Sequence, residues 1–172
     1  MLDKKIFFIP ALVGIVLYRI ENDALRVLVG NDCGTPVAVM VGRVVRQDRD
    51  DREAAVRILG KKLGFSVPIN SLRPFSCYGP GTPYARLHIG RRDGVVELTH
   101  ARRVAGEILR TTETFLKVMT LQWPGPPPIT GKASRIDGLS FYSLRELAEQ
   151  RIGLPYEQAR IIHDLERQRS RR

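Results

Sequence analysis

Residues 54–65 read Ala-Ala-Val-Arg-Ile-Leu-Gly-Lys-Lys-Leu-Gly-Phe, and the pattern within this stretch decides the fold. Four apolar side chains recur at the three- and four-residue spacing of a helix with one buried face: Ala55, Ile58, Leu59 and Leu63. Asp50 is placed to cap such a helix, Glu53 follows three residues later, and Gly64 is the residue type that most often follows a helix. The pattern predicts a helix over residues 50–63.

Positive charge is concentrated on and just before this helix. Arg57 and Lys61 lie four residues apart, a like-charge pair that costs a few tenths of a kcal/mol unless an anion lies between the two groups. A helix N-terminus also favours anions through its free N–H groups and its dipole. We therefore expect phosphate-bearing ligands or nucleic acid to contact this region, with a solvated basic face as the alternative. The candidate anion-binding residues are Arg43, Arg46, Arg49, Arg52, Arg57, Lys61 and Lys62.

The composition is that of one globular, basic domain. The chain has 172 residues with 43% hydrophobic residues, enough for a single substantial core. Lys and Arg number 28 against 18 Asp and Glu, a formal charge of +10. Such a field attracts polyanions, either a nucleotide, nucleic acid or the acidic face of a protein partner. We expect a single domain over residues 1–168 and a basic C-terminal tail over residues 169–172.

Neither a membrane span nor a disulfide framework is expected. The longest apolar run, residues 6–18, contains Pro10 and Gly14 and is shorter than the roughly 20 residues needed to cross a bilayer. Cys33 and Cys77 are too few for a disulfide scaffold or a cysteine-based zinc site. These features predict an intracellular protein, cytoplasmic by default and without a membrane partner.

Strand patterns flank the central helix on both sides. Alternating or continuous apolar runs bounded by turn residues predict strands over 5–9, 11–20, 25–29, 37–41, 72–78, 84–89, 95–98, 115–123 and 139–142. Asn22-Asp23 supplies the turn of a hairpin over residues 11–29. Further helices are predicted over 99–110, over 143–150 behind the capping box Ser143-Leu-Arg-Glu146, and from Pro155 as the first helical residue. This alternation predicts an α/β protein.

The stretch 54–65 resembles the second half of the Nudix box, the signature of the Nudix hydrolases. The box reads small-small-x-Arg-Glu-apolar-x-Glu-Glu-x-Gly-apolar, and six positions match: Ala54, Ala55, Arg57, Leu59, Gly64 and Phe65. The degenerate box spans residues of about 42–65, with Val41-Gly42 as the leading glycine pair, one residue out of the standard spacing. The element order over residues 6–168 is also similar to that family. The resemblance implies an α/β/α sandwich with a mixed central sheet.

The residues that bind metal in the Nudix family are replaced in this chain. Three box glutamates fall on Ile58, Lys61 and Lys62, and the upstream glutamate, eight residues before Arg57, falls on Arg49. A divalent cation needs carboxylates at such positions, and ammonium groups repel it. The arginine of the box orients a metal-binding glutamate in the family, so Arg57 is expected to lack an acidic partner. No metal is therefore expected in the box, and no catalytic residue is assigned.

Other acids are weaker candidates for a metal site. Asp48, Asp50, Asp51 and Glu53 are better interpreted as N-terminal charges that complement the helix dipole than as a relocated site. Glu97, Glu107 and Glu113 each offer a single carboxylate from later segments, as some family members use for their base. The three histidines, His88, His100 and His163, show no metal-ligand spacing.

Two functions remain open at this stage. The first is a catalytically silent Nudix-like protein that binds a nucleotide or nucleic acid, or serves as a subunit of a larger assembly. The second is a divergent but active diphosphatase, which would use Mg²⁺ to hydrolyse a nucleoside diphosphate linked to another moiety. The lysines at positions 61 and 62 favour the first function.

Overall fold

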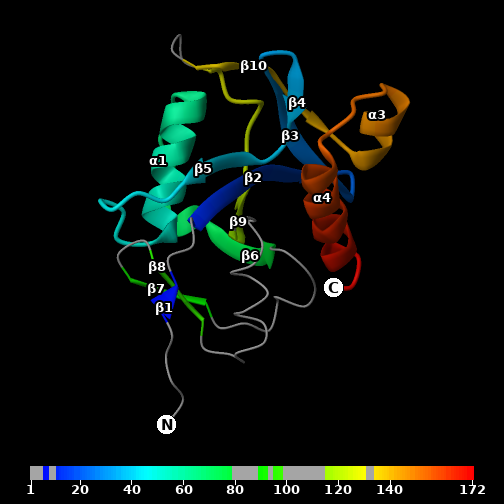
Figure 1. Cartoon of the computed structure of the whole chain (residues 1–172). Coiled ribbons are helices and arrows are strands. Elements are labelled where there is room, and N and C mark those ends of the chain that lie inside the picture. The colour runs from blue at the N-terminus through cyan, green and yellow to red at the C-terminus, as the bar shows by residue number, and fades with distance from the viewer. Residues whose placement is uncertain (1–5, 8–10, 79–88, 93–94, 99–114, 131–133) are drawn as a thin grey trace.

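A computed structural model describes residues 6–7, 11–78, 89–92, 95–98, 115–130 and 134–172 (Figure 1). Its main sheet has seven strands: β2 (Ala11–Glu21), β3 (Ala24–Asp32), β4 (Thr35–Val37), β5 (Met40–Arg43), β6 (Arg73–Tyr78), β9 (Phe115–Gln122) and β10 (Ile136–Tyr142). A second, three-stranded sheet pairs β1 (Ile6–Phe7), β8 (Val95–Leu98) and β7 (Ile89–Arg92). The helical elements are α1 (Asp51–Leu63), a 3₁₀ turn (Ile69–Ser71), α3 (Leu144–Glu149) and α4 (Tyr156–Arg169).

The main sheet is mixed and grows outward from one hairpin. Strands β2 and β3 pair antiparallel across a turn at Asn22-Asp23, where both residues have positive φ, 50° and 58°. Such values are those of the hairpin turns whose twist matches a sheet. Strand β9 then pairs with β2 in parallel, from Ala11↔Phe115 to Tyr18↔Gln122. The strand order is β10-β3-β2-β9-β6, with β5 also on β2 and β4 also on β3.

Both faces of this sheet are buried, which explains the continuous apolar run of β2. Ile15 and Leu17 belong to a core shared with α1, whereas Val16 between them belongs to a core shared with α4. Successive side chains of a strand point to opposite faces, so a strand covered on both sides has no polar side. Figure 1 shows α1 and α4 on opposite sides of the sheet. The predicted α/β/α sandwich with a mixed central sheet is confirmed.

Helix α1 begins and ends where the sequence predicts. The side chain of Asp50 accepts a hydrogen bond from the Glu53 amide, and Gly64 ends the helix with φ 78°, a left-handed conformation that costs glycine little. Phe65 then packs on Trp123, with 5.3 Å between ring centroids, which ties the end of α1 to the end of β9. Ala54, Ala55, Ile58, Leu59 and Leu63 form the buried face.

Several element boundaries differ from the predictions. The strand predicted over 37–41 is interrupted at Ala38 and Val39, whose amides both donate to the Oε1 atom of Gln158 in α4. The last strand begins at Ile136 and not at residue 139, and Pro155 is the N-cap of α4 and not its first residue. The predicted helix over 99–110 and most of the predicted strand over 84–89 lie outside the described residues.

No helix in the described part of the chain is both long enough and apolar enough to cross a bilayer.

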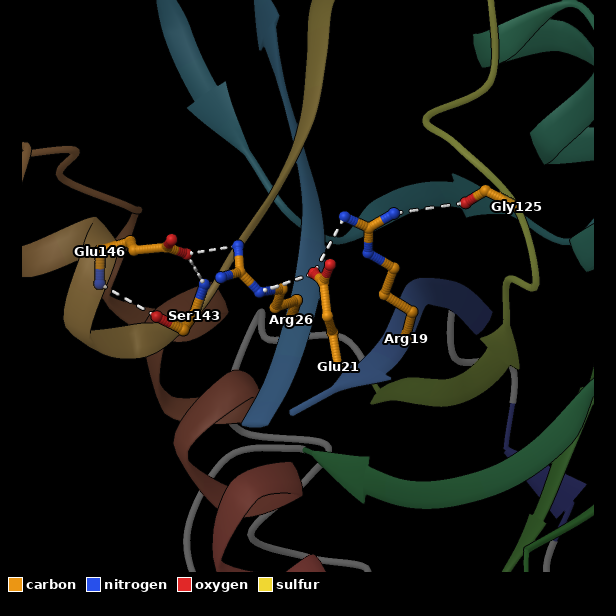
Figure 2. Close-up of polar contacts among 6 residues, drawn as sticks. All are labelled: Arg19, Glu21, Arg26, Gly125, Ser143 and Glu146. Carbon is orange, nitrogen blue, oxygen red and sulfur yellow. Dashed lines mark hydrogen bonds and ion pairs between the residues drawn. The ribbon is translucent and has the colours of Figure 1, made fainter. Parts of the chain in front are cut away.

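A chain of charged groups fastens α3 to the β2–β3 hairpin (Figure 2). Arg19 pairs with Glu21 at 3.1 Å, Glu21 with Arg26 at 3.0 Å, and Arg26 with Glu146 at 2.9 Å. Glu146 also accepts from the Ser143 amide at 2.8 Å, and the Ser143 hydroxyl accepts from the Glu146 amide at 3.1 Å. The predicted capping box is therefore present, and its glutamate serves as the last link of the chain of charges.

Replacement of Leu59 by Ala is expected to destabilise the protein by about 2–5 kcal/mol, because Leu59 is fully buried between α1 and the sheet. Urea denaturation followed by circular dichroism measures the change. The matched control is Ile129→Ala, since the Ile129 side chain is 94% exposed and its removal leaves no cavity. Equal stability of the two variants would contradict the assigned core.

Glu146 is expected to make stability depend on acid pH. The hydrogen bond from the Ser143 amide, followed by the nearby Arg26 charge, lowers the pKa of Glu146. A lowered folded-state pKa contributes stability above the unfolded-state value, and that contribution is lost as pH falls through the folded-state value. The wild-type protein should therefore exceed Glu146→Gln in urea midpoint at pH 7, and this difference should shrink near pH 3. A difference that is constant with pH would show that the carboxylate charge is not involved.

Candidate functional site

Helix α1, which carries the box-like stretch, packs against β5 through Ile58. This residue stands where the resemblance places the first of the three box glutamates. Ile58 is 3% exposed and lies in the core with Leu59. A Cβ atom added to Gly42 would lie 2.6 Å from Ile58 Cγ1, so the glycine allows the helix to approach the strand this closely. The place of a metal-binding carboxylate is therefore filled by a buried alkyl group, where an ionised carboxylate without a partner would be costly.

Arg57 has an acidic partner, contrary to the expectation from the sequence. Its Nε and Nη2 atoms donate to the two carboxylate oxygens of Asp48 at 2.9 and 2.8 Å, and Nη2 also donates to the Arg43 carbonyl at 2.7 Å. The Val45 amide donates to Asp48 Oδ2 at 2.9 Å. These hydrogen bonds raise the pKa of the Arg57 guanidinium. We refer to this group as the Arg57–Asp48 clamp, which holds the loop between β5 and α1.

The spacing of the Nudix box predicted the position of the acidic partner of Arg57 with an error of one residue. The family spacing places the acid at Arg49, whereas the acid in the structure is Asp48, nine residues before Arg57. The one-residue offset of Gly42 from the standard box was the signal that could have found it. The Asp48 side chain is only 5% exposed, and both carboxylate oxygens accept hydrogen bonds within the clamp. Asp48 therefore has a positioning role in the loop.

The first turn of α1 carries acids that occupy the helix N-terminus. Glu53 accepts from the Arg49 amide at 2.8 Å and pairs with the Arg49 side chain at 3.2 Å. Asp51 pairs with Lys117 of β9 at 2.7 Å. Together with the Asp50 cap, these contacts confirm that the acids complement the helix dipole. They also place negative charge where the sequence suggested that the helix N-terminus would attract an anion.

The structure does not gather all seven candidate basic residues in one place. Two are held by acids: Arg57 by Asp48, and Arg49, whose side chain is 88% exposed, by Glu53. The other five have no ion pair with any residue that the structure describes: Arg43, Arg46, Arg52, Lys61 and Lys62.

Three of these basic residues lie along one edge of α1. Lys61 follows Arg57 by one helical turn, about 6 Å along the axis, and Arg57 reaches the Arg43 carbonyl. Arg52 lies about 140° around the helix from Arg57 and belongs to the opposite edge. Lys62 is half-buried, and its carbonyl accepts from the Ser134 hydroxyl at 2.5 Å. The edge defined by Arg43, Arg57 and Lys61 is the candidate site, and Lys62 lies at its margin, about 100° around the helix from Lys61.

The residues at the box positions do not fit a divalent cation. A buried isoleucine offers no ligand atom, and two ammonium groups repel a cation. Within the described residues, no group of three or more His, Cys, Asp and Glu side chains is placed to hold a metal ion. Glu107, Glu113, His88 and His100 lie outside the described part, as does the side chain of Glu97.

Two titratable groups near the sheet edge are half-buried, and their pKa values are raised rather than lowered. Burial raises the pKa of the Cys77 thiol, while the neighbouring Lys117 ammonium opposes this shift and Asp51 adds to it. Burial also raises the pKa of Tyr78, and its hydroxyl donates to Asp164 at 2.9 Å. A thiol with a raised pKa is a poor nucleophile because the thiolate is the reactive form.

Several solved structures that are similar in fold are Nudix proteins. The Nudix domain of NrtR from Shewanella oneidensis, solved with ADP ribose, has a TM-score of 0.59 at 12% identity, covering 92% of this chain and 87% of that chain. The dihydroneopterin triphosphate pyrophosphohydrolase of E. coli gives 0.56 at 12%, covering 94% and 98%. A Nudix hydrolase from Alicyclobacillus acidocaldarius gives 0.53 at 11%, covering 92% and 91%.

The sequence itself matches no protein-family model and no curated protein. Structural likeness at 11–12% identity establishes a fold, and the chain has the Nudix fold expected from residues 54–65. Activity has to be argued from the site and not from the fold.

Replacement of Asp48 by Ala is expected to destabilise the protein by about 1–3 kcal/mol, because it leaves the Arg57 guanidinium and the Val45 amide without their acceptor. The Val45 amide should exchange hydrogen faster in this variant, which two-dimensional NMR measures. Asp137→Ala, at an exposed position on β10, is the matched control. A loss in Asp48→Ala no larger than in the control would show that the clamp does not hold the loop.

Proposed function

We propose that this protein binds a phosphate-bearing nucleotide at the edge of α1 and does not hydrolyse it through a box metal. The observation that carries the proposal is the exchange of residues at the box positions. One metal-ligand position holds the buried Ile58, and two hold Lys61 and Lys62, while the helix keeps its place on the sheet. The helix is therefore placed as in the Nudix fold, but two positions at which the resemblance implies glutamates carry positive charge.

Phosphate is the ligand chemistry that this charge favours. Ammonium and guanidinium groups donate charge-assisted hydrogen bonds to phosphate oxygens. Lys61 and Arg43 flank the Arg57–Asp48 clamp, so their backbones are fixed in relation to one another. Arg46, Arg49 and Arg52 extend the basic surface around the loop and the first turn.

The similar fold of the Shewanella oneidensis NrtR domain, which was solved with ADP ribose, supplies a probe for this proposal. ADP ribose carries a diphosphate between two ribose moieties. It is therefore both a phosphate-bearing nucleotide for the binding test and a linked nucleoside diphosphate that a diphosphatase could hydrolyse. The alternative is a divergent diphosphatase that hydrolyses such a linked nucleoside diphosphate with Mg²⁺. The remaining hypothesis is that the protein is a non-catalytic subunit that binds a protein partner.

Calorimetric titration with ADP ribose is expected to show binding that persists in EDTA. Reversal of Lys61 and Lys62 to Glu should weaken it by about tenfold or more, since charge-assisted hydrogen bonds contribute about 1.5–3 kcal/mol each. Arg145→Glu, at an 87% exposed arginine on α3, is the matched control and should change little.

Incubation of ADP ribose with Mg²⁺ should release no AMP. Mg²⁺-dependent turnover that disappears in Asp48→Ala or Asp51→Ala would overturn the proposal in favour of the diphosphatase. Absence of measurable ADP ribose binding, or binding unaffected by the Lys61 and Lys62 reversal, would exclude the edge of α1 as the site for this ligand class.

A further inference from the structure

The outer face of α4 carries a second basic surface, on the side of the sheet opposite to the box helix (Figure 1). Four exposed side chains recur there at helical spacing, namely Tyr156, Arg160, His163 and Arg167, and the exposed Arg171 follows in the turn after the helix. Ile161, Ile162 and Leu165 form the buried face of the same helix. Residues spaced by three and four lie on one side of a helix, so the four helical side chains form one stripe about 16 Å long, and Arg171 lies beyond its C-terminal end.

Helix α4 is anchored so that this stripe is presented without rearrangement. Gln158 Oε1 accepts from the Ala38 and Val39 amides at 2.8 and 3.1 Å. At the other end, the Arg169 guanidinium donates to the Asp23 carbonyl in the β2–β3 turn. The Tyr78 hydroxyl holds Asp164 from the side. A preformed surface avoids the ordering cost that flexible segments pay on binding.

The positive charge of α4 is supplied by arginine alone. Arg160 lies over the Tyr78 ring at 5.7 Å, and Arg171 has no acidic partner among the residues described. Arg167 pairs with Asp164 at 2.7 Å but keeps 63% of its side chain exposed. Glu157, Asp164 and Glu166 lie to the sides of the stripe. Arginine is the residue that best matches the planar, two-point geometry of phosphate.

The C-terminal end of α4 adds a shallow depression to this surface. It is lined by Asp164, Arg167, Gln168, Arg171 and Arg172. Three arginines and one carboxylate line the depression, and Asp164 pairs with Arg167, so Arg171 and Arg172 are the guanidinium groups left to bind a phosphate. The amide of Gln168 supplies a neutral donor beside them.

Tyr156 distinguishes between the kinds of polyanion. Its side chain is 79% exposed at the N-terminal end of the stripe, although a tyrosine usually buries its ring. An exposed ring one helical turn from Arg160, at the other end of the stripe from the depression, suits an unpaired base, which stacks on an aromatic face. Duplex bases are already stacked on each other, and an acidic protein surface offers no ring to stack.

We propose that the outer face of α4 binds single-stranded nucleic acid, with the arginines on successive phosphates and Tyr156 under a base. This surface is independent of the nucleotide site on α1, because the sheet lies between the two helices. The two proposals therefore succeed or fail separately.

Fluorescence anisotropy with the full chain tests this proposal, using labelled oligo(U) and oligo(dT) of about 12 nucleotides, within the range that single-strand sites span. Binding is expected to weaken with salt, with a slope of roughly −0.7 for each phosphate contact. Arg167→Glu combined with Arg171→Glu should weaken binding more than tenfold and flatten the salt slope. Tyr156→Ala should weaken binding by roughly tenfold and leave the salt slope unchanged, since stacking carries no counterion release.

Crossed variants separate the two surfaces. The Lys61 and Lys62 reversal should leave oligonucleotide binding unchanged, and the Arg167 and Arg171 reversal should leave ADP ribose binding unchanged. Circular dichroism melting confirms that each variant is folded. Tighter binding of a duplex with no effect of Tyr156→Ala, equal competition by polyglutamate, loss of binding with the Lys61 and Lys62 reversal, or no binding at low salt would each overturn the assignment.

Discussion

The guanidinium of Arg57 joins three parts of the molecule that the chain keeps apart. It projects from the middle of α1, takes both oxygens of Asp48 in the preceding loop and reaches the carbonyl of Arg43 at the end of β5. Strand β5 lies on β2 in the sheet, so the clamp sets the position of the box helix against the sheet. The basic edge of α1, the closure of the loop and the packing of Ile58 on Gly42 all depend on this position.

In helix α1, the residues that pack on the sheet and the residues expected from the resemblance to bind metal are mostly different ones. Helix packing depends on Ala54, Ala55, Leu59 and Leu63, which face the core, and the first three of these also match the family pattern. Metal binding in the family depends on other positions, and here those positions hold one more core residue and two lysines. Only Ile58 belongs to both sets, so the helix keeps its packed face with lysines at the other two positions.

The sheet also separates the two basic helices from each other. Its alternating side chains form two cores, one beneath α1 and one beneath α4, so each helix has its own outward surface. The α3 helix is fastened through charged groups on the β2–β3 hairpin (Figure 2). Helix α4 is fastened through Gln158 and its buried apolar side chains. Solved Nudix structures at 11–12% identity have a similar fold. Similarity of fold alone does not establish a shared activity.

The sequence by itself determined the elements whose cause is local. The spacing of Ala55, Ile58, Leu59 and Leu63, the Asp50 cap and Gly64 predicted α1, and Ser143-Leu-Arg-Glu146 predicted the capping box, because both depend on residues within one or two turns. Tertiary structure decided the interruption at Ala38 and Val39, which depends on Gln158 about 120 residues later, and the early start of β10, which depends on pairing with β3. It also decided that Arg57 has a partner. Asp48 lies one residue before the expected position, and the conformation of the loop brings it to Arg57. Local sequence patterns do not encode that loop conformation.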